Sequence, residues 1–99
     1  MDIEDEEQEY KVIDLAKNMP GLVIVFGHSL FHQKMASSLD RLISHQSPLV
    51  RKTIAAGFHV LADKYFIPMD LKDKLADKFK VLINDDDHLV VGNILKNII

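Results

Sequence analysis

Two stretches decide the fold: residues 31–58, FHQKMASSLDRLISHQSPLVRKTIAAGF, and residues 71–98, LKDKLADKFKVLINDDDHLVVGNILKNI. Aligned at an offset of forty residues, they carry apolar side chains at the same positions and turns at the same place. The coinciding pairs are Phe31 with Leu71, Met35 with Leu75, Ala36 with Ala76, Leu39 with Phe79, Leu42 with Leu82, Ile43 with Ile83, Leu49 with Leu89, Val50 with Val90, Ile54 with Ile94 and Phe58 with Ile98. Two helical stripes and their turn matching at one offset favour an internal repeat of helical hairpins, about 29–66 and 69–99.

Turn signals delimit these helices. Ser47-Pro48 predicts a helix start, because serine accepts a hydrogen bond from a free backbone N–H and proline fits the first helical position. That helix is expected to run on through Tyr65. Asp70 is predicted to cap the next helix, and the run Asp85–Asp87 to open the last one, where acids favour the positive end of the helix dipole.

Residues about 6–19 form an amphipathic pattern that predicts a leading helix. Pro20-Gly21 is expected to stop it, since proline disfavours helical geometry in the residue before it. Residues 22–26 are apolar and too short for periodicity to decide between a helical turn and an extended segment. Together, residues 1–99 are predicted to form one all-α domain, a leading helix followed by about two hairpin repeats.

Charge and composition exclude several classes of protein. The chain carries a net charge of −3, but residues 10–99 hold 12 basic against 9 acidic side chains, because six acids lie in the first nine residues. Such mild basicity does not indicate nucleic-acid binding. The longest apolar run, 22–26, is too short to cross a membrane. The absence of cysteine excludes disulfides and thiolate chemistry, and fits a reducing compartment such as the cytoplasm.

The segment 47–59, SPLVRKTIAAGFH, resembles the second helix of a HEAT repeat, in which a Val-Arg pair recurs. With residues 16–20, AKNMP, and Phe31-His32, it is similar to the regulatory subunit 4 family of serine/threonine protein phosphatase 4 and related phosphatase scaffolds. The resemblance covers residues 10–66 well and 67–99 only as a generic repeat. It implies a HEAT/armadillo-like superhelix without an active site or cofactor, whose partner is a phosphatase catalytic subunit.

HEAT repeats often place an aspartate six residues before this arginine, and neighbouring repeats join the two into a ladder. Here Arg51 has His45 at the aspartate position, while Asp85 has Val91 at the arginine position. One complementary pair remains across the two repeats. We therefore expect Arg51 to lie within ion-pair reach of Asp85 or Asp86.

The second helix of the first hairpin is also the expected partner-binding surface, because second helices line the concave side of such solenoids. The candidate residues are Ser47, Arg51, Lys52, Ala56, His59 and Asp63. His59 is more readily explained as a packed or solvated residue than as a contact. Gly57, in mid-helix, costs about 1 kcal/mol relative to alanine. It predicts either a close approach of a neighbouring helix, which we favour, or space for a partner.

The residues that could take part in catalysis or in metal or phosphate binding are explained more simply by structural roles. His28 and His32 are spaced for one helix face, but the glutamate of a zinc-peptidase motif is missing, so surface or half-buried histidines are favoured over a zinc site. Ser29 lacks the context of a catalytic triad. The lysines Lys72, Lys74, Lys78 and Lys80 alternate with aspartates, which favours a solvated face with Asp70–Lys74 pairing over phosphate recognition. The acids 85–87 lack the glycine and distal glutamate of a calcium loop, which favours capping.

The sequence therefore predicts a non-catalytic scaffold that binds a protein partner, neither nucleic acid nor membrane. The rival hypothesis is a self-contained helical bundle that acts as a small regulator or dimerisation module. Residues 94–99, ILKNII, carry no polar cap. That end predicts either a piece of a longer array or a homodimer through uncapped ends.

Overall fold

The computed structural model describes residues 3–96, with side chains from residue 8 onward, and this part of the chain is all helical. Its elements are α1 (Ile3–Phe26), α2 (His28–Ile43), α3 (Pro48–Ala56), α4 (Phe58–Leu61), the π-helical turn η1 (Ala62–Phe66), α5 (Lys72–Ile83) and α6 (His88–Lys96). Within residues 3–96 there is no strand, which confirms the all-α prediction. Ile98 and the side chains of the acids at 2 and 4–7 lie outside the described part.

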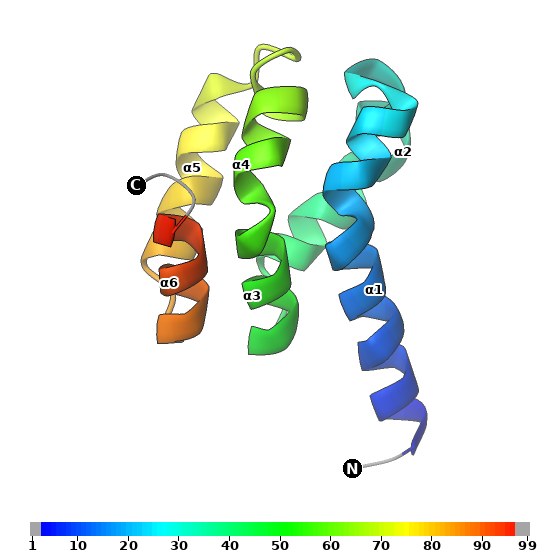
Figure 1. The fold of residues 1–99 in the computed structure, drawn as a ribbon, viewed down its shortest axis with the longest axis vertical. Helices are drawn as coiled ribbons and strands as arrows, with labels where there is room; N and C mark the ends of the chain where they lie inside the picture. The colour runs from blue at the N-terminus through cyan, green and yellow to red at the C-terminus, as the bar shows by residue number, and fades with distance from the viewer. Residues whose placement is uncertain (1–2, 97–99) are drawn as a thin grey trace.

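The helices form two layers. In Figure 1, α1, the α3–α4 column and α6 lie side by side and run in the same direction, while α2 and α5 run in the opposite one. Helix α3 packs against both α1 and α6, and α5 packs against α6. The molecule measures 41 × 28 × 18 Å. The central column α3–α4 therefore has a helical neighbour on each side.

The first helix extends beyond its predicted end. Pro20 lies inside α1, which continues to Phe26, so the expected stop at Pro20-Gly21 is wrong. A proline within a helix costs about 3 kcal/mol. Met19 and Val23, on either side of it, are almost fully buried, and burial of two such side chains contributes about 1.5–3 kcal/mol each. The helix ends instead at Gly27, whose φ of 78° is a left-handed conformation that glycine adopts without strain.

The second helix is interrupted where it meets that proline. A Cβ atom added at Gly57 would lie 2.5 Å from Cγ of Pro20, so the prediction that Gly57 permits a close helix approach is confirmed. Helix α3 ends at Ala56, α4 restarts at Phe58, and η1 follows. The expected single helix through Tyr65 is therefore wrong. The helix breaks at Gly57, where the ring of Pro20 occupies the space that a side chain would take.

The helix starts predicted from the sequence are confirmed in part. Pro48 is the first residue of α3, as predicted, but the Ser47 hydroxyl donates to Glu9 of α1 at 2.7 Å instead of accepting from the helix. Asp70 has a φ of 57° in the turn before α5 and does not cap this helix, which starts at Lys72. The last start is as expected: the Asp87 carboxylate accepts the N–H of Leu89 at 2.8 Å.

The hydrophobic core runs through both hairpins. Its buried members are Ala16, Met19, Val23, Phe31, Leu39, Leu42, Ile43, Val50, Ile54, Ala55, Phe58, Leu61, Tyr65, Phe66, Leu82, Val90 and Ile94. Leu89, which the sequence pattern placed on an apolar stripe, is exposed, and so is Leu30. The buried part of each apolar stripe is thus narrower than the stripe seen in the sequence. The buried residues of the two hairpins form one continuous core.

The two hairpins have helix ends that differ by forty residues. Helices α2 and α5 end at Ile43 and Ile83, and helices α3 and α6 start at Pro48 and His88. The residues after α2 and α5 have nearly the same backbone angles, φ −104° and ψ 17° at Ser44, φ −99° and ψ 12° at Asn84.

The turns between the helices also use corresponding hydrogen bonds. The N–H of Ser44 donates to the Asp40 carbonyl at 3.3 Å, and that of Asn84 to the Lys80 carbonyl at 3.1 Å. Three residues later, the N–H of Ser47 donates to His45 Nδ1 at 3.0 Å, and at the corresponding place the N–H of Asp87 donates to Asp85 Oδ1 at 2.9 Å. The correspondence therefore extends to individual atoms of the turns.

Candidate partner-binding surface

Arg51 and Asp85 join the two turns. Arg51 Nε donates to Asp85 Oδ2 at 2.6 Å and Nη2 donates to Oδ1 at 3.1 Å, so the two groups lie within the expected ion-pair reach. The Arg51 side chain is 17% exposed and that of Asp85 is 7% exposed. Partial exclusion of water and the two-bond geometry make this pair stronger than an ordinary surface ion pair.

The same guanidinium also holds its own turn. Nη1 of Arg51 donates to the carbonyls of His45 at 2.7 Å and Gln46 at 3.0 Å. These two hydrogen bonds satisfy carbonyl groups of the turn that follows α2. One side chain thus ties the α2–α3 turn to the α5–α6 turn.

The pair shifts the titration of both groups. The hydrogen bond from Arg51 lowers the pKa of the Asp85 carboxyl, and the N–H of Asp87 acts in the same direction. The hydrogen bond with Asp85 raises the pKa of Arg51, and the charges of Asp87 and Asp86 add to it. Both shifts favour the charged forms, so the pair stays ionised over the ordinary pH range.

The six candidate residues fall into two groups. Ser47 and Arg51 are half-buried and make the contacts to α1 and α5–α6 described above. Ala56 at the end of α3, His59 in α4 and Asp63 in η1 are exposed, and together with Lys52 they form the candidate face along this column. Lys52 begins this face and is half-buried; its backbone carbonyl accepts from Asn93 of α6 at 3.1 Å.

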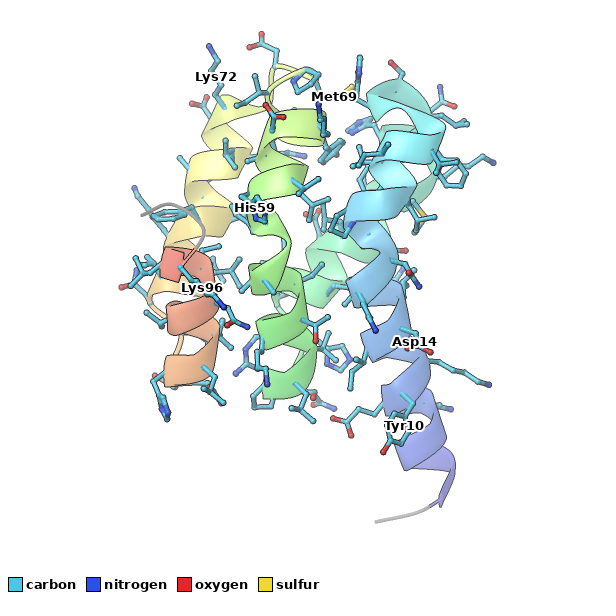
Figure 2. The ribbon with its side chains drawn as sticks, viewed as in Figure 1. Tyr10, Asp14, His59, Met69, Lys72 and Lys96 are labelled. Atoms are coloured by element: carbon cyan, nitrogen blue, oxygen red, sulfur yellow. The ribbon has the colours of Figure 1, made fainter. Side chains whose placement is uncertain are left out.

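An apolar groove of about 330 Å³ borders this face, between α4 and α5. It is lined by Phe58, His59, Ala62, Lys72, Leu75, Ala76 and Phe79. Figure 2 shows His59 on α4 with Lys96, from α6, just below it. The sequence pattern did not predict the groove: it shows Leu75 and Phe79 only as members of an apolar stripe, and the structure leaves both half-buried.

No family model, curated protein or solved structure matches this chain. The scaffold function below accordingly rests on the residues and geometry of the molecule, together with the resemblance seen in its sequence.

A second, more polar pocket of about 540 Å³ lies between α1 and the α2–α3 turn. Gln8, Glu9 and Val12 line it from α1, and residues 45–48 line it from the turn. The hydrogen bond between Glu9 and Ser47 crosses from one wall to the other.

His28 and His32, for which the sequence favoured surface or half-buried positions over a zinc site, have different surroundings. His32 Nδ1 is hydrogen-bonded to the buried Tyr65 hydroxyl at 2.7 Å, and the two rings stack with centroids 5.8 Å apart. His28 is exposed. Burial, and then the charge of Asp40, raise the pKa of Tyr65. Among the described residues, no three His, Asp or Glu side chains gather closely enough to hold a metal ion.

The lysine-rich helix α5 is largely solvated. Lys72, Lys74 and Lys80 are exposed, and Lys78 pairs with Asp40 of α2 at 3.4 Å. Asp70 lies in the turn outside the helix, so the helical Asp70–Lys74 spacing does not apply. In the described part of the chain, no helix is both long enough and apolar enough to cross a membrane.

Proposed function

We propose that this chain is a HEAT-like repeat scaffold without catalytic activity, and that it binds a protein partner through the face formed by half-buried Lys52 and exposed Ala56, His59 and Asp63. One observation carries the proposal: α3 and α6 follow turns with corresponding hydrogen bonds, start forty residues apart, and lie side by side in one direction. Repeats related by translation produce this arrangement, since each unit buries its apolar face against the next.

The leading helix fits the same scheme as the second helix of an incomplete preceding unit. It lies on the other side of α3 from α6 and runs in the same direction (Figure 1). The Arg51–Asp85 pair would then be one rung of a ladder between units. Its geometry supports that role, because it connects corresponding turns of the two hairpins.

The resemblance of residues 10–66 makes a serine/threonine phosphatase catalytic subunit the proposed partner. The test is binding of the immobilised 99-residue chain to purified phosphatase catalytic subunits. We expect Lys52→Glu/His59→Glu to weaken binding at least tenfold, because the double change reverses charge across the proposed face. Gln33→Glu/Lys34→Glu, on the exposed side of α2, is the matched control and should bind like the wild type.

Two results would contradict this proposal in different ways. Absence of binding by the wild-type chain would remove the phosphatase as partner. Equal weakening by both double variants would remove the assigned face, since the loss would then follow net charge and not position.

A second candidate function is self-association through the corner between α1 and α2. Ile24, Val25, Phe26 and Leu30 are all exposed there, an unusual concentration of apolar surface. Light scattering after size exclusion tests it. If this corner is the interface, Val25→Glu converts a dimer to a monomer, while a wild-type monomer at all concentrations rejects the dimerisation module.

A further inference from the structure

We propose that the groove between α4 and α5 binds an acidic, amphipathic helix of a protein partner, and that the apolar face of this helix fills the groove. The inference rests on the protein-binding function proposed above, and it adds the chemistry of the segment that is bound. The groove is lined by apolar side chains from two neighbouring helical columns, with one lysine and one histidine beside them: Phe58, Ala62, Leu75, Ala76, Phe79, Lys72 and His59.

The apolar lining is not covered by the rest of the described chain. Leu75 and Phe79 are only half-buried and Ala76 is exposed, although they line the same groove as the buried Phe58. Removal of apolar surface from water is favourable roughly in proportion to its area, so an apolar face that covers this lining is stabilised there. Apolar surface bordered by polar groups is typical of protein-binding sites.

The walls of the groove are suited to a helical occupant. In Figure 1, α4 and α5 lie side by side and run in opposite directions. The lining positions of α5 are 72, 75, 76 and 79, a spacing of three and four that defines one stripe of this helix. An amphipathic helix binds in a groove of this kind through apolar residues at the same spacing.

The border of the groove is basic. Lys72 is part of the lining, and Figure 2 shows Lys96 just below His59. Both lysines are exposed, and among the described residues neither has an ion-pair partner. The acids of α5 face elsewhere, because at about 100° per residue Asp73 and Asp77 are turned by more than about 100° from the lining stripe.

This charge favours an acidic occupant. Asp63 is the one acid of residues 48–66, which form the opposite wall, and it pairs with Lys64 at 3.5 Å. Residues 97–99 contain no acidic side chain, so their side chains could not neutralise Lys72 or Lys96. A partner helix with acids beside its apolar stripe would cover the lining and complement both lysines.

The probes are two synthetic peptides of about fifteen residues, a length at which an isolated helix begins to be stable. Both carry leucines at every third and fourth position. Glutamates flank this stripe in one peptide and lysines flank it in the other, with alanines elsewhere. Fluorescence anisotropy measures their binding to the 99-residue chain. We expect the acidic peptide to bind at least about tenfold more tightly, and to shift the NMR amide signals of Ala62, Ala76 and Phe79.

The chain offers a matched pair of variants, Lys72→Glu and Lys74→Glu. Both lysines are exposed and lie in the first turn of α5, where a glutamate is compatible with the helix dipole. Lys72 lines the groove, whereas Lys74 is turned by about 150° from the lining stripe. We expect Lys72→Glu to weaken binding of the acidic peptide about three- to tenfold and Lys74→Glu less than about twofold.

Equal affinity for the two peptides, equal weakening by the two variants, or no binding of either peptide at about millimolar concentration would overturn the inference. Two other occupants would give different results. Peptide binding that requires deletion of residues 97–99 would make those residues the occupant. A dimer that Lys72→Glu dissociates in the absence of peptide would make the occupant a second copy. Either result also overturns the inference.

The phosphatase assay separates this inference from the function proposed above. If a phosphatase catalytic subunit binds and Lys52→Glu/His59→Glu weakens it, while neither peptide binds, only the groove inference fails. If the acidic peptide binds as expected and no phosphatase does, the proposed partner fails and the groove inference stands.

Discussion

Asp85→Asn tests the connection between the two turns. The change keeps the shape of the side chain but removes the charge that holds Arg51 at 2.6 and 3.1 Å. Hydrogen bonds to charged groups contribute about 1.5–3 kcal/mol when buried, and partial exposure of this pair lowers that range. Because Arg51 keeps its two carbonyl partners in the variant, we expect unfolding to become easier by about 1–2 kcal/mol.

The assay is urea and thermal unfolding followed by circular dichroism, at low and high salt. A loss near 1.5 kcal/mol lowers the Tm of a domain of this size by about 6–12 °C. The cycle of Arg51→Gln, Asp85→Asn and the double variant isolates the pairwise part. Asp63→Asn is the control, because its ion pair with Lys64 is exposed and should change stability by less than about 0.5 kcal/mol.

The pH dependence gives an independent check of the same pair. Asp85 has a pKa below its ordinary value of 3.8 in the folded protein, so its contribution is present above that value and is lost as the pH falls through the folded pKa. Wild-type stability should therefore fall more steeply than that of Asp85→Asn below about pH 4. A coupling energy below about 0.5 kcal/mol, with parallel acid profiles, would refute the reasoning.

Other substitutions probe the remaining contacts. Gly57→Ala should destabilise the protein by about 1–3 kcal/mol in urea unfolding, because its Cβ would lie 2.5 Å from a proline carbon of α1. Gly21→Ala, whose Cβ would meet no atom within 4 Å in the described part, should stabilise α1 by about 0.5–1 kcal/mol. Tyr65→Phe removes the hydrogen bond to His32 and should cost about 0.5–1.5 kcal/mol. Since the folded pKa of Tyr65 is raised above 10.0, its contribution is lost as the pH rises through that pKa, and the variant should lack this alkaline loss. Leu82→Ala should cost about 2–5 kcal/mol by leaving a cavity in the core, measured by the same unfolding.

Local patterns were sufficient for much of the fold. The apolar period of α2 and α5, the Ser47-Pro48 start and the acids before α6 were visible in the sequence, because each depends on side chains within a few residues. The Arg51–Asp85 contact was predictable for a different reason. The expectation came from the aspartate–arginine ladder that the resemblance to HEAT repeats implies, and the structure places the two residues in contact.

Features decided by distant packing were not predictable. Pro20 carries a stop signal, and only the burial of Met19 and Val23 against other helices overrides it. The groove beside His59 depends on which surface of α5 has no helix packed against it. The sequence shows that a residue is apolar, but not whether another helix packs against it. The face proposed for a partner was named from geometry and resemblance, and it stays a prediction.

The fit between Pro20 and Gly57 has an evolutionary consequence. One position lacks a side chain and the other fills the space with a ring, so neither can change freely while its counterpart remains. Sequences that share this fold should vary at the two positions together. Where position 57 carries a side chain, position 20 should carry a residue whose own side chain leaves that space free. Such covariation would record the contact between α1 and α4 without any further structure.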